Sequence, residues 1–343
     1  MKNSKIKKSV TIAALGKKYN YRAHIDAFTQ FFFNRGFSVN YILNKDFYSP
    51  NFYKVGSFMK SDNLFIIFPF KEMLFYSFVR WIFKKKSYYW FHEPFESFNR
   101  YKKSGNSFFW ITQFYLKSVY SYFTCFFCDT VFLPSDLAVK NYKKSIMFCN
   151  KIKFAKFPLI YPDRIDFTKK EKLISYLGTI SKDHAFDKFI ETIINNESFL
   201  IKNNFKVLVA TSNEVDKLSL NKLNSLNIHT QIIHSKSINE EDMNSFYSRT
   251  FFLWNSYNRT TQSGVLVNGF RHNCIPIFHL DNVKFEYKNI CLLLKTKKYL
   301  IDIDNFNFAL NNSKNIFNSI HDMYLNNYSY QSILKSEIFT NEV

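Results

Sequence analysis

Ser263 and Gly264 stand where a helix is predicted to begin, and their residue types suit the binding of an anion. The first turn of a helix has backbone N–H groups without intrahelical partners and carries the positive end of the helix dipole, so it favours a phosphate group. Arg259 lies just upstream as a candidate phosphate clamp, and Thr261 and Gln262 would complete the pocket floor. A plain N-cap explains Ser263 but not the adjacent glycine.

A second group of polar residues follows a predicted strand in the first half of the chain. His92 ends the strand predicted at residues 88–92, and Glu93 and Pro94 come directly after it. Polar groups at the carboxyl end of a parallel strand commonly face a ligand, and Pro94 would fix the turn. Gly16 and His24 follow the first predicted strand, so we expect them to face the same cleft as His92 and Glu93.

Other motif-like groups are predicted to be structural. Cys125 and Cys128 form a C-x-x-C inside an apolar run, without a second pair at zinc spacing, so we expect buried thiols and a reducing, cytoplasmic compartment. Asp302 and Asp304 have the spacing of a metal-binding D-x-D, but they lie late in the chain, after the last strand predicted for either sheet. We therefore expect no metal there. The chain lacks G-x-G-x-x-G and G-x-x-x-x-G-K-[ST], which disfavours a dinucleotide dehydrogenase and a P-loop NTPase.

Apolar runs alternate with amphipathic stretches along the chain, which predicts an α/β fold in two halves. The strands and helices of this fold must position the residues named above. Pro158 and Pro162 mark a linker, which gives domains at 1–162 and 163–343. Gly16 and Gly178 end the first strand of each half, where a glycine allows close approach of a ligand. Strands are predicted at 10–16, 37–43, 64–70, 88–92, 130–134, 152–157, 173–177, 206–210, 228–233, 251–255 and 275–278, and helices at 23–35, 72–83, 107–127, 187–194, 240–248, 264–271 and from 315 onward.

The charge of the chain is concentrated in its first half. The sequence has 47 Lys and Arg against 27 Asp and Glu, a net charge of +20; residues 1–160 hold 26 and 8 of these, and the remainder 21 and 19. Such an excess indicates an anionic partner: nucleic acid, an anionic membrane surface or a phosphate-bearing substrate.

A basic and aromatic face is predicted around residues 78–90, and Trp and Lys of this kind prefer the interface of an anionic membrane. A core helix with a solvated basic end explains the same pattern. The apolar segment 107–128 is predicted as a partly buried amphipathic helix that can touch a bilayer rather than a span. The residues assigned to the membrane face are Arg80, Trp81, Lys84, Lys85 and Lys86.

Two segments resemble the donor domain of GT-B glycosyltransferases. Residues 173–191, LISYLGTISKDHAFDKFIE, resemble the strand, glycine, loop and helix that open that domain, and residues 251–277 resemble its later strand, Ser-Gly-Val helix start and Pro-containing strand. The resemblance is to the group 1, family 4-like enzymes that build bacterial surface polysaccharides such as O-antigen and capsule. It extends over most of the chain in the order of its elements, but only these two segments are motif-like.

The resemblance implies two Rossmann-like domains that face each other across a cleft, and a metal-independent, retaining transfer from a nucleotide-sugar donor to a lipid-linked saccharide at the inner face of the cytoplasmic membrane. No cofactor is implied beyond the nucleotide-sugar co-substrate. His92 is similar to the histidine that many members place near the reacting sugar, and Glu93 could orient acceptor hydroxyls or stabilise positive charge at the anomeric carbon. Gly178, Ser263 and Gly264 would bind the donor.

The chain departs from the family pattern at three donor positions. Thr179 and His184 stand where an Arg and a Lys on the diphosphate are usual, and Asn268 replaces the second of two glutamates, the one on the ribose. His184 could substitute as a cation, or it could be a surface histidine without a role.

Two other classes of protein remain open. A nucleic-acid-binding protein would explain the charge and the aromatic residues, but it leaves Gly178 and the Ser263–Gly264 pair unexplained, and no nucleic acid is expected as a partner. A nucleotide-sugar epimerase of the same fold would not need a basic, aromatic face.

Overall fold

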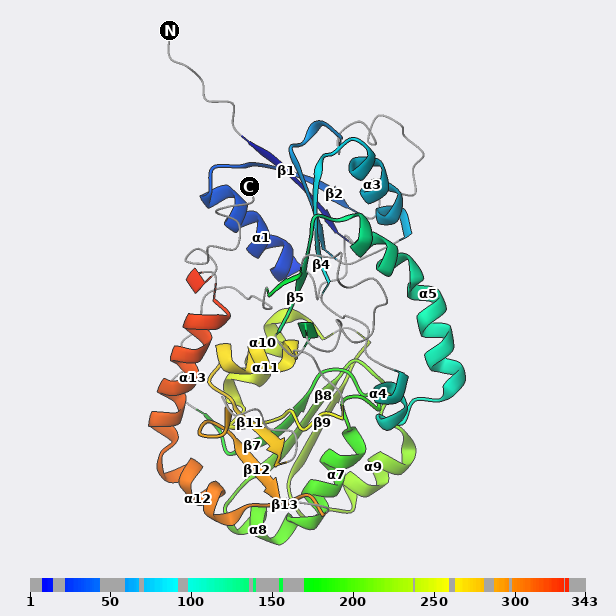
Figure 1. Cartoon of the computed structure of the whole chain (residues 1–343). Coiled ribbons are helices and arrows are strands. Elements are labelled where there is room, and N and C mark those ends of the chain that lie inside the picture. Colours follow the sequence, from blue (N-terminus) through cyan, green and yellow to red (C-terminus); the bar gives the residue numbers. More distant parts are fainter. Residues whose placement is uncertain are drawn as a thin grey trace. The chain divides into compact units, whose positions relative to one another are not determined.

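The chain divides into two compact units in the computed structural model (Figure 1). Unit 1 comprises residues 1–162 together with 328–343, and unit 2 comprises residues 163–327. We expected the second domain to continue to residue 343, whereas the last residues group with unit 1. The structure describes residues 8–14, 22–43, 59–67, 71–91, 98–135, 138–139, 154–156, 170–236, 238–258, 263–280, 287–295, 298–329 and 331–332.

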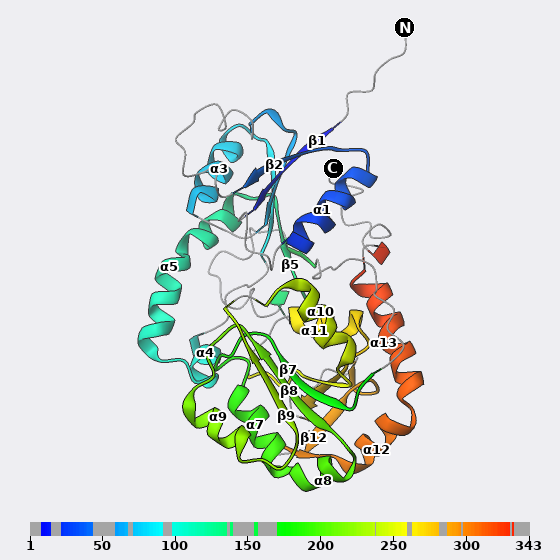
Figure 2. The same cartoon turned by 180° about the vertical axis from the view of Figure 1, so that it is seen from behind.

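The described part of unit 1 contains a six-stranded parallel sheet with the order β2-β1-β3-β4-β5-β6. Helix α1 covers one face of this sheet, and α3 and α5 lie together on the other (Figures 1 and 2). The elements are β1 (Ser9–Ala14), α1 (Arg22–Asn34), β2 (Ser38–Leu43), β3 (Asn63–Ile67), α3 (Lys71–Ile82), β4 (Lys86–Trp90), α4 (Phe98–Lys103), α5 (Phe108–Phe127), β5 (Thr130–Leu133) and β6 (Phe154–Lys156).

The central strands of unit 1 are buried on both faces, as their continuous apolar runs require. On the α1 side the core is aromatic: the Phe28 ring lies 4.6 Å from that of Phe65 and 5.2 Å from that of Trp90. Trp90 is the last residue of β4, so this packing fixes the carboxyl end of that strand, two residues before His92 in the sequence.

Arg80 is buried beneath α3, so the expectation that it faces a membrane is wrong. Its guanidinium donates hydrogen bonds to Ser87 Oγ at 3.2 Å and to the carbonyl oxygens of Ser61, Asp62 and Lys86 at 3.2, 2.9 and 2.7 Å. Burial lowers the pKa of Arg80 to about 10, which still leaves it charged at neutral pH. These four hydrogen bonds, three of them to carbonyl oxygens, compensate for the burial of the charge.

The described part of unit 2 contains a seven-stranded sheet with the order β13-β12-β11-β10-β7-β8-β9, parallel except for the last pair, β12 and β13. Helices α7 and α9 lie on one face, and α10 and α11 on the other (Figures 1 and 2). The elements are β7 (Leu173–Leu177), α7 (Phe186–Asn195), α8 (Glu197–Lys202), β8 (Lys206–Thr211), α9 (Lys217–Asn224), β9 (Thr230–His234), α10 (Glu240–Arg249), β10 (Phe252–Trp254), α11 (Gly264–Arg271), β11 (Ile275–His279), β12 (Leu292–Lys295), β13 (Leu300–Ile301), α12 (Ile303–Asn311) and α13 (Ser313–Asn327).

Helix α11 lies very close to β10 because Gly269 has no side chain. A Cβ atom added at Gly269 would fall 2.4 Å from Leu253 Cδ2, closer than two carbon atoms can approach. On the same face of the sheet, Leu173, Leu177, Leu208 and Tyr247 form a buried apolar cluster with Val265 packed against it. The position of α11 is therefore set by close packing.

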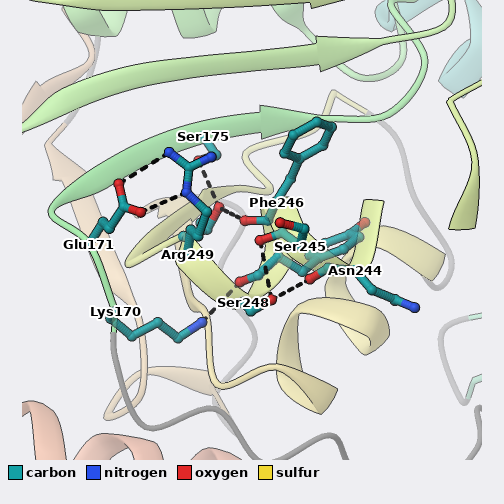
Figure 3. A network of polar contacts seen from close by, with 10 residues as sticks. Lys170, Glu171, Ser175, Asn244, Ser245, Phe246, Ser248 and Arg249 are labelled. Atoms are coloured by element: carbon teal, nitrogen blue, oxygen red, sulfur yellow. Dashed lines mark hydrogen bonds and ion pairs between the residues drawn. The ribbon is translucent and has the colours of Figure 1, made fainter. Parts of the chain in front are cut away.

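A polar network ties the start of unit 2 to the end of α10 (Figure 3). Glu171 accepts hydrogen bonds from Arg249 Nε at 2.6 Å and from Nη2 at 3.2 Å, and Lys170 Nζ donates to the Tyr247 carbonyl oxygen at 3.0 Å. Hydrogen bonding to Glu171 raises the pKa of Arg249. Since these residues precede β7, at the edge opposite its carboxyl end, the network is structural.

The predicted alternation of strands and helices is confirmed, with most boundaries within two residues of the structure. The sequence patterns missed α4, α8, α9, α12, β12 and β13. Asp302 of the D-x-D sequence caps α12: its Oδ1 accepts the N–H groups of Asp304 and Asn305 at 3.1 and 3.2 Å.

Helix α5 begins at a serine cap, where Ser107 Oγ accepts the Trp110 N–H at 3.2 Å. Cys125 and Cys128 lie near its end, and both are buried with free thiols as expected. Among the residues that the structure describes, no helix has both the length and the apolar character needed to cross a membrane.

The His272 imidazole predicts a pH dependence of stability. It stacks on Tyr247 with ring centroids 5.6 Å apart, and its Nε2 lies 3.2 Å from Asn244 Oδ1. Burial, assisted by the charges of Arg271 and Lys170, lowers its pKa from 6.5 to about 3. The unfolded chain therefore binds the proton more readily than the folded chain. The contribution of His272 to the free energy of unfolding is present in full above about pH 6.5 and is lost as the pH falls towards 3.

Between about pH 7 and pH 5 we expect this group to remove about 2 kcal/mol from the free energy of unfolding, measured by urea denaturation. His272→Asn should make the free energy of unfolding less dependent on pH over this range, whatever its effect on stability at neutral pH. His229→Asn, at an exposed histidine, should keep it. An unchanged slope in His272→Asn would contradict the assignment.

Candidate functional site

Gly178 connects the two sequence segments singled out in unit 2. It follows β7 directly with φ at +114°, a conformation that other residues rarely adopt, and its N–H donates to the Ala210 carbonyl oxygen at 2.9 Å. A Cβ atom here would lie 3.2 Å from Val265 Cγ2 in the first turn of α11. The loop after β7 therefore rests on the beginning of α11, and Gly178 and Gly264 lie close together.

This junction is the switch point of the sheet. From β7 the chain moves outward through β8 to β9, and it returns to β10 on the other side of β7 before continuing to β11. In doubly wound sheets, ligands bind beyond the carboxyl ends of the strands at this point. The carboxyl ends of β7 and β10 and the start of α11 therefore define the candidate site.

Ser263 caps α11 and has two hydrogen-bonded neighbours. Its Oγ accepts the Leu266 N–H at 3.2 Å, and its side chain also hydrogen-bonds the hydroxyl group of Tyr257. Burial raises the pKa of Tyr257 well above its usual range, so the hydroxyl stays neutral. The capping role explains Ser263, and the contact between Gly178 and Val265 brings this helix start, with its positive dipole end, against the β7 loop.

His184 is oriented by three contacts. Its Nδ1 lies 2.7 Å from the Thr179 carbonyl oxygen, which can only accept, so Nδ1 carries the proton and Nε2 is the nitrogen left to meet a ligand. Its ring packs against Tyr257 with centroids 4.6 Å apart, and its carbonyl oxygen accepts the Trp254 Nε1–H at 3.1 Å. These contacts hold the imidazole in one orientation.

Thr179 contributes its backbone to this arrangement. Its carbonyl oxygen also accepts the Tyr176 hydroxyl at 2.8 Å, so it is held by a residue of β7 and by His184 at once. Burial raises the pKa of Tyr176, which keeps it a neutral donor. The loop ends at Ala185, which begins α7 in the left-handed conformation with φ at +53°.

Lys188 and Asn258 were not identified from the sequence. Lys188 Nζ donates to Asn258 Oδ1 at 2.6 Å, and Asn258 Nδ2 donates to the Lys182 carbonyl oxygen at 2.7 Å. The Asn258 N–H donates to the Asp183 carbonyl oxygen at 2.9 Å. These bonds join the loop after β10 to the loop after β7 and fix a cation one helical turn beyond His184. The spacing of four residues between His184 and Lys188, which corresponds to about one helical turn, could have identified Lys188 from the sequence.

Asn255 has a buried side chain whose hydrogen-bonding groups are unused. It follows β10 directly and is 2% exposed, and within the described part of the chain neither its Oδ1 nor its Nδ2 has a hydrogen-bond partner. The same holds for the buried Oδ1 of Asn268 in α11. An unpaired buried amide costs about 1–3 kcal/mol, so each group requires an explanation, such as a bound ligand or water.

The structure describes only part of the predicted site. Gly178, Thr179, His184, Ser263, Gly264 and Asn268 are placed in unit 2 as described above. His24 lies in unit 1, buried on α1 with its ring 5.3 Å from that of Trp90, near the carboxyl edge of the first sheet. Gly16, His92, Glu93, Arg259, Thr261 and Gln262 lie outside the described residues.

No family model and no curated protein sequence matches the chain. Solved structures do resemble it. Sucrose-phosphate synthase from Thermosynechococcus elongatus superposes with a TM-score of 0.61 at 8% identity, with 96% of both chains covered. WaaG, a glycosyltransferase involved in lipopolysaccharide biosynthesis, gives 0.55 at 10% identity, also with 96% of both chains covered. UDP-GlcNAc 2-epimerase from Methanocaldococcus jannaschii gives 0.51 at 11% identity over 91% of this chain and 93% of that one.

These likenesses establish the fold. The chain is an α/β protein of the GT-B type, with two Rossmann-like domains built on parallel sheets, which confirms the fold class expected from the sequence. The same fold occurs in glycosyltransferases and in UDP-GlcNAc epimerases, so the fold does not choose between transfer and epimerisation.

Gly178→Ala tests the close contact at the site. We expect it to lower the free energy of unfolding by about 2–4 kcal/mol, because it combines a strained φ with a clash against Val265. Gly36→Ala is the matched control: Gly36 also has a positive φ, at +81°, but nothing lies within 4 Å of an added Cβ, so it should cost only about 1 kcal/mol. Equal losses in urea denaturation would show that the contact with α11 is not tight.

Proposed function

We propose that the protein is a glycosyltransferase that moves a sugar from a nucleotide-sugar donor to a lipid-linked saccharide in the synthesis of a bacterial surface polysaccharide. The donor would bind unit 2, and the acceptor would bind unit 1. The reaction would take place at the inner face of the cytoplasmic membrane. The observation that carries the proposal is the contact of the Gly178 loop with the start of α11 at the switch point of the second sheet.

The donor site would stabilise the leaving nucleoside diphosphate. During transfer the bond from the anomeric carbon to the diphosphate oxygen breaks, and a bond to an acceptor hydroxyl oxygen forms. The proton of that hydroxyl is released to solvent, and the nucleoside diphosphate departs. The leaving diphosphate gains negative charge, which the dipole of α11, His184 Nε2 and the Lys188 ammonium would offset. These groups would act without a metal ion. Chelation with EDTA should therefore leave the transfer rate unchanged.

Two of the proposed donor contacts are assigned from their position in the sequence. Arg259 and Gln262 precede α11, and we assign them to the diphosphate and the sugar. Asn268, with its unpaired Oδ1, would take the position of the family's ribose-binding glutamate. The acceptor side is assigned to His92 and Glu93 as the residues nearest the reacting carbon, with Gly16 and His24 beside them.

The proposal is tested by a thermal-shift panel of UDP-, GDP-, CMP- and dTDP-sugars on the full chain. We expect one nucleotide class to raise the melting temperature in a concentration-dependent way. Stabilisation by single-stranded RNA or DNA and by none of the sugars would contradict the proposal and favour a nucleic-acid-binding protein.

His184 and Lys188 are tested with the nucleotide that the panel identifies. His184→Ala and Lys188→Met should each weaken its binding about ten-fold or more, since each removes a charge-assisted contact to the diphosphate. His184→Lys should retain binding, because the family places a lysine there. His229→Ala, at an exposed histidine of the same unit, should bind like the wild type. Titration calorimetry gives the four affinities.

An epimerase is the competing activity, because the chain also shares its fold with UDP-GlcNAc 2-epimerase. Incubation of the bound nucleotide-sugar without an acceptor separates the two activities. An epimerase interconverts the sugar at a carbon of the intact donor, whereas the proposed transferase releases nucleoside diphosphate only when a lipid-linked acceptor is added. Formation of an epimer without acceptor would overturn the transferase proposal.

A further inference from the structure

Helix α3 buries two polar side chains beside its apolar core contact Met73, and it leaves large apolar side chains in solvent. Its inward face carries Ser77 and Arg80, both 0% exposed, while its outward face carries apolar side chains such as Trp81, which is 53% exposed. In a soluble protein the apolar stripe of a helix normally faces the core. Here Met73, Ser77 and Arg80 share the inward face, and Ser77 and Arg80 each have their own hydrogen-bond partners, while a row of apolar side chains remains exposed to solvent. The outward residues are Phe75, Phe78, Trp81 and Ile82.

Helix α5 exposes a second apolar row. Phe109, Leu116 and Phe123 recur every seven residues and are 70%, 70% and 52% exposed, while Ile111 and Cys125 on the opposite face are fully buried. The helix contains no Asp or Glu. The helix does contain polar residues such as Gln113 and Lys117, so the exposed row is an apolar stripe on a mixed helix. The outward residues are Phe109, Leu116, Val119, Phe123 and Phe126.

The two rows meet near the carboxyl ends of the helices. Phe127 at the end of α5 lies 5.1 Å from Phe78 and 5.5 Å from Trp81, measured between ring centroids. Figures 1 and 2 show α3 and α5 beside each other on one face of the first sheet. We call the nine outward residues of the two helices the aromatic face. Exposed apolar surface of this extent on one side of a unit usually marks an interaction site.

Lysines follow the aromatic face directly. Lys84 ends α3 in the left-handed conformation with φ at +52°, and Lys84 and Lys86 are exposed. Lys85 is partly buried and donates from Nζ to the Met59 carbonyl oxygen. Exposed lysines at the rim of an aromatic surface complement an anionic headgroup layer, where each adds on the order of 1 kcal/mol of attraction.

We propose that the aromatic face lies in the headgroup region of an anionic bilayer, with α3 and α5 parallel to the membrane plane. Phe and Trp side chains suit this depth, and Lys84 and Lys86 would contact the phosphates. A second copy of the chain fits less well, because it would bring another cluster of the same lysines towards the first. Of the membrane contacts expected from the sequence, the proposal keeps Trp81, Lys84 and Lys86 and drops the buried Arg80. It also specifies which face of α5 takes part, and it does not depend on the proposed transferase activity.

The test is flotation of the full chain with vesicles of phosphatidylcholine, with and without phosphatidylglycerol. The wild type should float with the mixed vesicles. The triple variant Phe109→Ser, Leu116→Ser, Phe123→Ser should partition about ten-fold less or lower still, because it removes most of the insertable row of α5. Phe308→Ser is the control, since Phe308 lies on α12 of unit 2 and is 50% exposed; it should float like the wild type.

The lysines are tested separately with Lys84→Asn, Lys86→Gln. Asparagine tolerates the left-handed conformation at residue 84, so the end of α3 should persist. This variant should lose the preference for phosphatidylglycerol and the sensitivity to salt, while it keeps weak binding to both vesicles.

Three outcomes would overturn the proposal. The wild type could fail to float with either vesicle, or the triple variant could float as well as the wild type. Sedimentation could also show a dimer that the triple variant abolishes, which would make the aromatic face a contact between copies. The melting temperature of the triple variant should equal or exceed that of the wild type, which separates loss of binding from loss of folding.

Discussion

The close packing of α11 between two glycines is the constraint on which unit 2 depends. Gly269 lets the helix lie directly on Leu253 of β10, and Gly178 lets the loop after β7 rest on its first turn at Val265. Any side chain at either position would push the helix away from the sheet or the loop away from the helix. Because α11 is held from both sides, Ser263 and the helix dipole have a fixed relation to the Thr179–Ala185 loop.

The loop itself is organised around that fixed point by hydrogen bonds that cross between segments. Trp254 and Asn258, on either side of the end of β10, hold the carbonyl oxygens of His184, Lys182 and Asp183. Lys188 and His184 are thereby presented from an ordered backbone. The second half of the sequence has almost no net charge, so unit 2 depends on such individually placed cations, whereas the excess of positive charge lies in residues 1–160.

The sequence was most informative where local pattern and tertiary structure agree. Continuous apolar runs such as 173–177 predicted buried parallel strands, and Gly178 and Ser263 marked two places that the fold brings together. Short elements escaped prediction: α8 and β13 have six and two residues, and they are defined by contacts such as the Asn196 hydrogen bonds to Tyr299 and Ile301. Arg80 was misassigned for a related reason, since a charge in a helix reads as exposed unless its distant carbonyl partners are known.

Lys84 shows how local conformation and surface chemistry oppose each other at one residue. A lysine in the left-handed region costs about 1 kcal/mol relative to glycine, which usually ends helices in this geometry. The two backbone bonds that close α3, from Lys84 N–H to the Trp81 carbonyl oxygen and from Lys85 N–H to the Arg80 carbonyl oxygen, would form equally well with glycine. Folding stability alone would therefore favour glycine here, whereas the lysine places an exposed ammonium group directly after the helix.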